Sequence, residues 1–325
     1  MKMKMSGPRW RLVGTPDGLF IHDRGTGLCI FNPAVKTSRW TKPLYAQVAV
    51  TERCNLHCWW CYASSSPCGG AEWSAEGLKR LARFLDSWGL LGVAYGGGEP
   101  FVHPSIVEVI RYTWENTGLD VSVTTNGYAP TEEQLRGIEG RASEVRVSIR
   151  HPEDCANLRK FIGRGFELGV NLLLMRGNAP LIGELMDRCA EMGIEDFLIN
   201  SFMATGGGAQ YRLMEPTEED MTALCEVVDR HGEATIRVSS RLAAMMRESG
   251  GAQRRHKFIP FSDERRGRIV AITADRKVKP SSLSREAYPF DRLEDIPEIY
   301  ARMANGGEAQ IRTEARSPLE VGEVS

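Results

Sequence analysis

The sequence predicts an α/β fold built around a parallel sheet, and three features of the 325-residue chain support this prediction. Short apolar runs alternate with helical patterns six times between residue 47 and about residue 230. Turn-rich, strand-like segments precede this region, and the alternation fades from about residue 235. Repeated strand–helix units favour a parallel sheet with helices outside it. Six such units are two fewer than a complete eight-stranded barrel contains.

Residues 1–46 are expected to form a small β meander. Apolar alternations at residues 10–13, 19–22 and 28–31 are separated by turn signals rich in glycine. Such a pattern is typical of short antiparallel strands joined by tight turns. Two roles remain open for the meander. It covers an open edge of the next domain, or it offers a sheet edge to an extended peptide.

The six strand–helix units are expected within residues 47–232. The strands are predicted at residues 47–51, 92–95, 121–124, 145–149, 170–175 and 197–200. Apolar residues at helical spacing predict helices from Leu78 to Trp88, Ile106 to Trp114, Leu158 to Ile162 and Ile182 to Cys189. Capping residues predict two more helices, one that begins after Thr131 and one that begins after Thr217 and continues through Val228. Chemistry gathers at the carboxyl ends of strands in parallel α/β sheets, so the segments that follow the strands are the candidate site.

Three cysteines follow the first predicted strand. The spacing of Cys54, Cys58 and Cys61 lets a short loop bring three thiolates to one inorganic centre. A structural zinc site normally has four ligands, and a complete iron–sulfur site usually supplies four thiolates. Three thiolates suit a four-iron cluster with one iron left open to a non-protein ligand. Two alternatives stay open: neighbouring thiols without a metal, or a zinc site completed by His57 or a distant cysteine.

The pattern Cys-x-x-x-Cys-x-aromatic-Cys, with Trp60 at the aromatic position, resembles the signature of the radical S-adenosylmethionine (radical SAM) enzymes. The segment Gly96 to Pro100, after the second strand, resembles the Gly-Gly-Glu-Pro motif of that family. The resemblance implies a partial (β/α)6 TIM-like barrel, one 4Fe-4S cluster held by the three cysteines, and SAM on the open iron. It also implies reductive cleavage of SAM to a 5′-deoxyadenosyl radical, which abstracts a hydrogen atom from the substrate.

The resemblance assigns several residues to SAM. Gly97, Gly98 and Glu99 are expected at its methionine end, because glycine lets a ligand approach the backbone closely and a carboxylate accepts hydrogen bonds from an amino group. Trp60 is expected to pack near the adenine. Asn126 lies in a Thr-Asn-Gly segment that resembles one found at the third strand end of many members, although a strand-terminating turn is also compatible.

The fourth strand ends at a position where peptide-modifying relatives often carry Ser-hydrophobic-Asp-Gly. Ser148 fits a hydrogen bond to SAM, whereas Arg150 reverses the usual charge. The Arg150 guanidinium could pair with the SAM carboxylate or with an anionic part of the substrate. It could instead form a structural salt bridge with Glu153 or Asp154, and both interpretations stay open.

Other candidate residues have weaker signals. The segment 200–208, after the sixth strand, is expected to form a floor for the adenosine or a rim for the substrate. Cys155, Cys189 and Cys225 fall on apolar helix faces, where cysteine behaves as a small hydrophobic residue. Cys68 has two open roles, as an inert loop thiol or as a hydrogen-atom donor that faces the active site.

Residues 233–305 are expected to form a hairpin-and-helix appendage. Strand-like residues 267–273 turn into residues 278–280, and a helical pattern follows from Leu293 to Tyr300. This arrangement resembles the SPASM or twitch appendage of many peptide-modifying radical SAM enzymes, which carries cysteines for auxiliary clusters. Ser281 and Ser282 stand where a cysteine would follow the proline, so no second cluster is expected. The appendage would cover the barrel mouth and shape the substrate pocket.

Charge and composition restrict the partners. The net charge is −1, from 41 basic and 42 acidic side chains, so no strong field favours nucleic acid or an anionic membrane. No apolar run near the amino terminus has the length of a signal peptide or membrane helix. A cytoplasmic location with reduced cysteines is therefore expected. The basic residues between 254 and 268 form a solvated face or bind an acidic peptide or phosphate, and residues 306–325 are expected to be disordered.

The implied function is that of a radical SAM enzyme, with a ribosomally made peptide as the preferred substrate. This preference rests on the meander and the appendage, and hence on fold analogy. The alternative is a radical SAM enzyme that acts on a small molecule such as a sugar, nucleoside or amino acid. A third possibility is a scaffold that binds a cluster for sensing or delivery without turnover. The resemblance also implies an electron donor such as flavodoxin or ferredoxin.

Overall fold

The computed structural model describes residues 10–15, 18–25, 29–33, 42–239, 241–243, 245, 259–260 and 269–304. Two sequence predictions lie outside these residues. They concern the basic side chains between residues 254 and 268 and the carboxyl-terminal segment 306–325.

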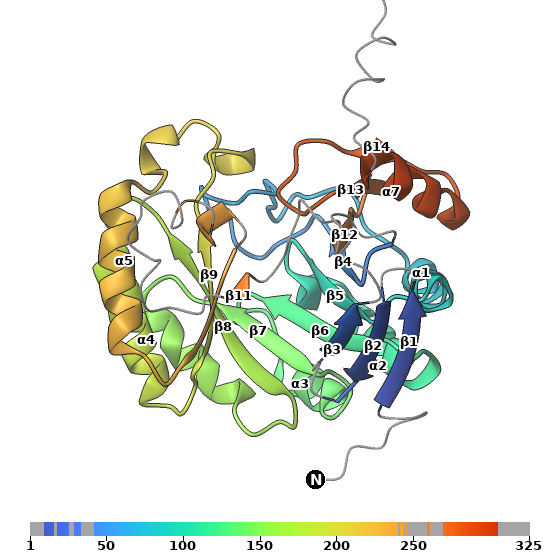
Figure 1. Ribbon diagram of the computed structural model, residues 1–325, viewed down its shortest axis with the longest axis horizontal. Helices are drawn as coiled ribbons and strands as arrows, with labels where there is room; N and C mark the ends of the chain where they lie inside the picture. The colour runs from blue at the N-terminus through green and yellow to red at the C-terminus, as the bar shows by residue number, and fades with distance from the viewer. Residues whose placement is uncertain are drawn as a thin grey trace, which may run out of the picture.

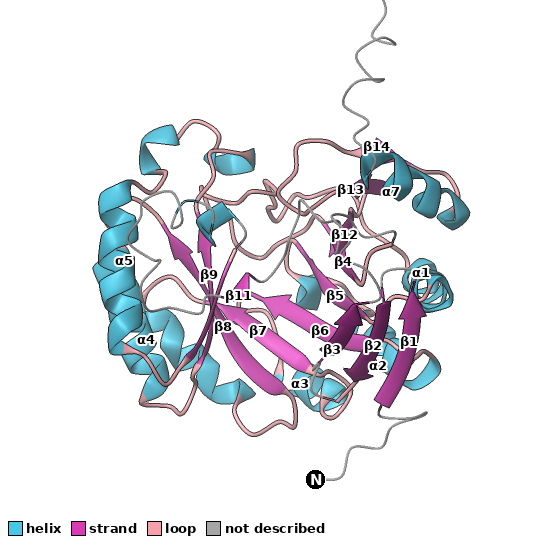
Figure 2. Cartoon of the chain, in the orientation of Figure 1, coloured by secondary structure: helices cyan, strands magenta, loops and turns pink. Residues whose placement is uncertain are grey.

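The described part of the chain is organised around one large curved sheet with helices on its outer side (Figures 1 and 2). The strands follow the order β11-β10-β9-β8-β7-β6-β5-β4-β12-β13-β14, and every neighbouring pair from β4 to β10 is parallel. The parallel strands are β4 (Tyr45–Thr51), β5 (Gly92–Gly97), β6 (Asp120–Thr125), β7 (Glu144–Ser148), β8 (Glu167–Leu174), β9 (Asp196–Ser201) and β10 (Thr235–Val238). The predicted parallel α/β architecture is thus confirmed.

Strand β10 was not predicted. It has only four residues and alternates polar with apolar side chains, so its sequence has no long apolar run. It forms because residues 235–238 pair in parallel with β9, and a two-residue strand β11 (Ile259–Pro260) then pairs with β10. The alternation of strands and helices therefore continues by one strand beyond the predicted six.

The helices on the outer side follow the predicted patterns, with one exception. They are α1 (Ala75–Trp88), α2 (Ile106–Asn116), α3 (Glu132–Ile138), α4 (Ala179–Ala190) and α5 (Glu218–Arg230). The predicted capping box of α3 is present, since the Thr131 hydroxyl accepts a 3.2 Å bond from the Gln134 backbone and the Gln134 side chain accepts from the Thr131 backbone. The helix predicted at Leu158 is instead the 3₁₀ helix η2 (Pro152–Phe161). The 3₁₀ helix ends before Ile162, whose side chain is exposed. Gly163 follows with a φ of +76°, a backbone conformation that does not continue a helix.

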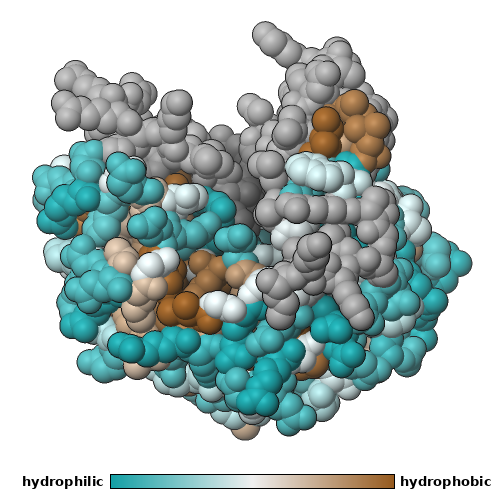
Figure 3. Space-filling view, turned by 90° about the horizontal axis from the view of Figure 1, so that it is seen from below, coloured by the Kyte–Doolittle hydropathy of each residue, from teal (hydrophilic) through white to brown (hydrophobic). Residues whose placement is uncertain are grey.

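The hydrophobic core lies between the sheet and these helices. Leu78, Leu81 and Leu85 of α1 are buried against strand residues such as Val93 of β5. Burying one such side chain contributes about 1.5–3 kcal/mol. In the part of this face that Figure 3 colours, hydrophilic residues predominate, and hydrophobic residues appear near the centre and at the upper right. Most large apolar side chains of the described residues are buried.

The amino-terminal meander is confirmed as a three-stranded antiparallel sheet, made of β1 (Trp10–Thr15), β2 (Gly18–Asp23) and β3 (Cys29–Pro33). Arg24 anchors it by donating a 2.8 Å bond to the Leu119 carbonyl and by lying over the ring of Trp114, 4.4 Å from its centroid. Trp114 lies near the end of α2, and Leu119 lies just before β6. The meander is therefore attached at the amino ends of the parallel strands.

The carboxyl-terminal part contains the predicted hairpin and helix. β12 (Ile269–Ile272) and β13 (Lys277–Lys279) form the hairpin, β14 (Tyr288–Pro289) pairs with β13, and α7 (Ile296–Ala304) follows. β12 also pairs in parallel with β4, so the hairpin extends the main sheet. The Trp73 indole donates a 3.0 Å bond to the Thr273 carbonyl at the hairpin turn. The hairpin is thereby held beside the segment that follows β4.

No helix in the described residues combines the length and the apolar character needed to cross a bilayer.

Candidate functional site

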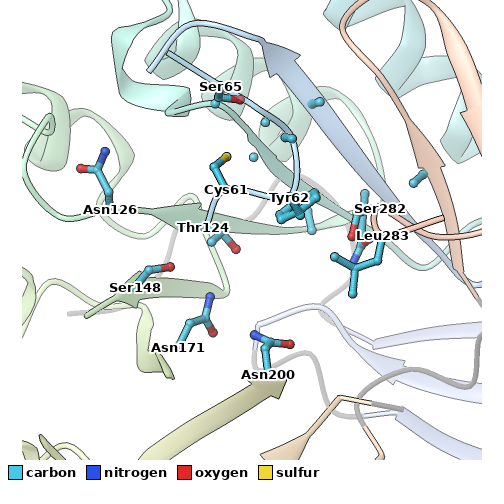
Figure 4. A pocket seen from close by; sticks show the side chains of 18 of the residues that line it. Cys61, Tyr62, Ser65, Thr124, Asn126, Ser148, Asn171, Asn200, Ser282 and Leu283 are labelled. Atoms are coloured by element: carbon cyan, nitrogen blue, oxygen red, sulfur yellow. The ribbon is translucent and has the colours of Figure 1, made fainter. Parts of the chain in front are cut away.

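A cavity of about 580 Å³ lies at the carboxyl ends of the parallel strands, between these strands and the hairpin (Figure 4). Its volume is within the range of ligand-binding clefts. Side chains from β4 to β9, from the loop after β4 and from the β12–β13 hairpin line it. Because strand ends from one end of the sheet converge there, residues far apart in the sequence share one wall.

The cysteine loop, which we define as residues 52–66, brings Cys54, Cys58 and Cys61 to the cavity, and all three line it. Backbone hydrogen bonds shape the loop: Cys54 N donates to the Ser66 carbonyl at 3.0 Å and Cys61 N donates to the Cys58 carbonyl at 3.1 Å. Among the residues that the structure describes, no three histidine, cysteine or carboxylate side chains surround a single-ion site. The assignment of these thiols to a four-iron cluster or to one zinc ion completed by His57 stays a prediction of the sequence.

The thiols occupy a partly desolvated environment with hydrogen-bond donors around one sulfur. Burial raises the pKa values of the Cys54 and Cys58 thiols, and the charge of Arg150 opposes this for Cys58. The Cys54 sulfur accepts a 3.4 Å bond from Leu56 N and a 3.8 Å bond from Asn126 Nδ2. Donors of this kind stabilise a thiolate, the form that binds metal.

Gly97 and Gly98 line the cavity and also hold the cysteine loop against β5. The Gly98 nitrogen donates a 2.8 Å bond to the Thr51 carbonyl. Gly97 has a φ of +121°, and a Cβ atom at Gly98 would collide with the Arg53 carbonyl. Glycine is therefore required here for close backbone approach, a reason that the sequence motif alone does not reveal.

Glu99 is fully buried and does not line the cavity. Its carboxylate accepts bonds from Phe101 N at 3.1 Å, from the Thr125 hydroxyl at 2.8 Å and from Asn126 N at 2.7 Å. Burial raises the pKa of Glu99 to about 7, although these three donors lower it. Glu99 thus connects the ends of β5 and β6, and its predicted bond to the SAM amino group stays a prediction.

Asn126 links the end of β6 to the cysteine loop. Its side chain donates a 2.8 Å bond to Asn55 Oδ1 in addition to the contact with Cys54, and its Oδ1 accepts from Tyr128 N at 2.9 Å. The side chain therefore positions a cysteine ligand and also terminates the strand, so the two interpretations of this motif are compatible.

Ser148, Arg150 and Trp60 all line the cavity. The Arg150 guanidinium lies 5.9 Å from the centroid of the Trp60 ring, and its Nη1 donates a 3.4 Å bond to the Ser148 carbonyl. Within the described residues it forms no ion pair, because the Asp154 carboxylate accepts from the backbone nitrogens of Arg150 and His151 and from the Tyr128 hydroxyl. The predicted salt bridge of Arg150 with Glu153 or Asp154 is thus not formed within the described residues, and its binding of an anion stays a prediction.

The segment at and after the end of β9 lies partly at the cavity and partly against the cysteine loop. Asn200, Ser201 and Phe202 line the cavity, whereas Gly206 to Gly208 do not. The Gly207 nitrogen donates a 2.8 Å bond to the Cys61 carbonyl, and a Cβ atom at Gly206 would collide with the Tyr62 carbonyl. The glycines predicted to form a floor or rim support the backbone of the cysteine loop instead.

Several lining residues were missed in the sequence. Tyr62, Asn171 and Lys279 line the cavity, and Figure 4 shows Tyr62 and Asn171 around the same open space as Ser148 and Asn200. A polar residue inside an otherwise apolar strand, such as Asn171 between Val170 and Leu172, was an available signal. Lys279 carried no such signal, because only the pairing of β12 with β4 brings the hairpin to the cavity.

An ion-pair network forms the floor of the cavity near the amino ends of the strands. Arg146 pairs with Glu144 at 2.5 Å and with Asp196 at 2.9 Å, and Arg237 on β10 pairs with Asp196 at 2.8 Å. The charges of these four side chains cancel. The network therefore joins β7, β9 and β10 and adds no net charge to this end of the cavity.

Four other described cysteines, Cys68, Cys155, Cys189 and Cys225, are not among the lining residues. Cys155 and Cys189 are buried and Cys225 is half-buried, in keeping with packing roles. Cys68 is exposed and does not line the cavity, so the hydrogen-atom-donor interpretation gains no support from the geometry.

Comparisons with known proteins agree with this geometry. The profile of the radical SAM superfamily matches residues 48–208. The antilisterial bacteriocin subtilosin biosynthesis protein AlbA of Bacillus subtilis is 28% identical over 195 residues, which cover 54% of this chain and 43% of AlbA. GTP 3′,8-cyclase of Chlorobaculum tepidum is 35% identical over 106 residues, 32% of each chain. The chain thus spans less than half the length of either relative.

A solved structure extends the similarity to the fold of nearly the whole chain. Streptococcus suis SuiB bound to S-adenosylmethionine superimposes with a TM-score of 0.69 at 14% identity, covering 93% of this chain and 90% of SuiB. A similarity of this kind concerns the fold only. The profile match, which includes the cysteine loop and the glycine motif, shows that residues 48–208 form a radical SAM domain and that the chain belongs to the radical SAM superfamily.

Proposed function

We propose that the protein reductively cleaves SAM and uses the resulting 5′-deoxyadenosyl radical to abstract a hydrogen atom from a ribosomally made peptide. The observation that carries the proposal is the convergence of Cys54, Cys58 and Cys61 on one cavity with the Gly97–Gly98 backbone. The peptide substrate is supported by the names of two similar proteins. AlbA acts in bacteriocin biosynthesis, and SuiB has been solved with the precursor peptide SuiA.

The residues present fit a 4Fe-4S cluster, the family's cofactor. Three thiols line the cavity, and Cys54 has two hydrogen-bond donors, from Leu56 and Asn126. Hydrogen bonds to ligating sulfur tune the potential of such a cluster. When bound, the cluster supplies the electron that cleaves the sulfonium of SAM. Protein residues keep the site in place, since Gly207 holds the Cys61 carbonyl and Asn126 orients Cys54.

The other lining residues fit SAM itself. The Arg150 guanidinium is placed to bind the SAM carboxylate, and the Ser148 hydroxyl can donate or accept a hydrogen bond beside it. The Trp60 ring offers an apolar face for the adenine. The Glu99 carboxylate supports this wall from behind, and among the described residues its Oε2 accepts only the bond from Asn126 N, which leaves one acceptor site for the methionine amino group.

A small-molecule substrate is the second candidate. It is supported by the similarity to GTP 3′,8-cyclase, which is 35% identical over its aligned region. A cavity of about 580 Å³ could admit either a side chain of a peptide or a small molecule beside SAM. We further propose a cytoplasmic location and a reductant such as flavodoxin or ferredoxin.

The proposal is tested by anaerobic reconstitution with iron and sulfide, followed by reduction with dithionite in the presence of SAM. Formation of 5′-deoxyadenosine, measured by liquid chromatography and mass spectrometry, is the expected result, and a variant in which Cys54, Cys58 and Cys61 are all replaced by alanine should form none. A loaded protein that never cleaves SAM would instead support the cluster-binding scaffold without turnover.

The same assay separates the two substrate classes. A short peptide encoded beside the gene for this protein, or GTP, is added to the reaction. Stimulation of 5′-deoxyadenosine formation by the peptide, together with a change in its mass, would support peptide modification. Stimulation by GTP alone would favour the small-molecule alternative.

A further inference from the structure

The proposed reaction leaves a carbon radical in the cavity, and a hydrogen atom given to that carbon is one way to end the reaction. The donor must hold its hydrogen by a bond weaker than the new C–H bond. Phenols and thiols meet this condition, whereas the aliphatic hydroxyls of serine and threonine hold their hydrogen too strongly. Cys68, the donor considered in the sequence, is exposed and does not line the cavity. A donor within the cavity must therefore be another side chain.

Two phenols lie among the described residues that line the cavity, at Tyr62 and Tyr95. The lining thiols are those of the cysteine triplet, which the proposed function assigns to the cluster. The Tyr95 side chain is 1% exposed, and its hydroxyl lies 2.8 Å from the Thr113 hydroxyl of α2. Because α2 is on the outer side of the sheet (Figure 1), the Tyr95 phenol points away from the cavity. Tyr62 is the candidate that remains.

The Tyr62 side chain is exposed toward the cavity. Tyr62 directly follows Cys61 in the cysteine loop and lines the cavity. Its side chain is 42% exposed, and yet burial raises the pKa of its phenol, which means that protein surrounds the hydroxyl end of the ring. Both observations hold together when the exposed part of the ring faces an internal space. A radical formed in the cavity would therefore meet this ring.

The hairpin side of the cavity provides a polar partner for the phenol. The Ser282 side chain interacts with the Tyr62 phenol through a hydrogen bond, and Figure 4 shows the two residues beside each other at the edge of the open space. Lys279 donates a 3.0 Å bond to the Ser282 carbonyl, which fixes the backbone of this residue. Because a serine hydroxyl both donates and accepts, Ser282 can orient the phenol and exchange a proton with it.

We infer that Tyr62 is a catalytic residue that donates a hydrogen atom to a carbon radical in the cavity; this inference rests on the proposed function. The O–H bond of the phenol breaks and a C–H bond forms on the substrate, which leaves a phenoxyl radical on Tyr62. One electron from the reductant of the flavodoxin or ferredoxin class, together with one proton from solvent, restores the phenol. Tyr62 is the neighbour of Cys61, so this electron has a short path to it.

The inference is tested with SAM alone, so the identity of the peptide is not needed. The reconstituted protein is exchanged into D₂O without added thiols, reduced with dithionite and supplied with unlabelled SAM. The 5′-deoxyadenosyl radical is then itself the carbon radical in the cavity, and the Tyr62 phenol carries deuterium from the solvent. The 5′-deoxyadenosine formed by the wild-type protein should therefore gain one deuterium atom, which mass spectrometry detects. The same reaction in H₂O gives the unlabelled reference.

Three variants assign the deuterium to Tyr62. Tyr62→Phe removes the hydroxyl and keeps the ring, so its 5′-deoxyadenosine should contain no deuterium. Tyr211→Phe is the matched control, because Tyr211 packs on Trp59 of the same loop, with ring centroids 4.5 Å apart, and does not line the cavity. Tyr211→Phe and Tyr95→Phe should both keep the deuterium. The wild-type reaction in D₂O tests the inference without any substitution, in case Tyr62→Phe folds poorly.

Two results would overturn the inference. The first is 5′-deoxyadenosine without deuterium from the wild-type protein in D₂O. The second is equal deuterium content in the products of the wild type and of Tyr62→Phe, which would assign the exchangeable hydrogen to another group. The proposed function fails separately, when the reduced wild-type protein forms no 5′-deoxyadenosine from SAM in either solvent.

Discussion

The Gly207 nitrogen donates a 2.8 Å hydrogen bond to the carbonyl of Cys61, so the segment after β9 holds the last residue of the cysteine triplet. These residues are far apart in the sequence. The neighbouring Gly206 has a φ of +56° and lies so close to the Tyr62 carbonyl that a side chain there would collide with it. The position of the third cysteine therefore depends on the glycines that follow the sixth predicted strand.

We predict that Gly206→Ala lowers the iron content after reconstitution and lowers the melting temperature. The backbone conformation alone costs a non-glycine residue about 1–2 kcal/mol, and the collision with the Tyr62 carbonyl displaces the cysteine loop. Iron per chain and thermal unfolding are the measurements. Gly193→Ala is the control, since Gly193 has a similar φ of +75° and a Cβ atom there would touch nothing within 4 Å. Equal iron content in both variants would contradict the supporting role of Gly206.

Replacing single cysteines should separate ligands from packing residues. Cys58→Ala is expected to abolish the visible absorbance of the reconstituted cluster, whereas Cys189→Ala, which changes a buried thiol away from the cavity, should retain it. The intact protein should bind about four irons per chain, the number for one cluster. A value near eight would show that the carboxyl-terminal part binds a second cluster, contrary to the prediction.

Glu99 should make stability depend on pH. Burial raises its pKa from the ordinary value of 4.5 to about 7, so the folded protein favours the protonated acid. The resulting stabilisation is complete below about pH 4.5 and is lost as the pH rises through about 7, by about 3 kcal/mol in total. Urea unfolding of the wild type and Glu99→Gln at pH 5 and pH 8 measures it. Relative to the wild type, the free energy of unfolding of Glu99→Gln should be higher at pH 8 than at pH 5. If the difference in free energy of unfolding between the two proteins is the same at both pH values, the raised pKa of Glu99 is refuted.

Arg146 should be a large contributor to stability. Its side chain is 4% exposed and pairs with two carboxylates that are 22% and 28% exposed, so Arg146→Met leaves partly buried negative charge that Arg237 only partly offsets. We expect a loss of about 3 kcal/mol or more in the free energy of unfolding, the usual result of breaking a buried pair. The exposed pair of Arg188 with Glu184 provides the comparison, because Arg188→Ala should cost less than about 1 kcal/mol. Similar losses in both variants would argue against the buried network.

Much of the fold could be predicted from local patterns. Apolar residues at helical spacing marked α1 and α2, and the Thr131 capping box marked the start of α3. These features depend on neighbours within a few residues, which the sequence displays directly. Strand β10 and the 3₁₀ helix η2 were not predicted correctly, since the first needs its pairing with β9 and the second ends at a glycine with positive φ.

The candidate site was predictable in its residue types and less so in its contacts. The cysteine triplet, Arg150 and Ser148 do line one cavity. Glu99, however, is not among the lining residues, and its buried carboxylate accepts bonds from Thr125 and Asn126, contacts that the motif alone did not reveal. Lys279 was missed for the opposite reason, since only the parallel pairing of β12 with β4 carries its strand to the cavity.

The sequence by itself determined the three-thiol spacing, the succession of strands and helices, and therefore the family, since each of these is a short-range property of the chain. Only the tertiary structure decided that the hairpin joins the sheet beside β4, that glycines after β9 hold the cysteine loop, and that Lys279 lines the cavity. The physical reason is that such contacts join residues far apart in the chain, and their partners are selected by packing and hydrogen bonding in three dimensions.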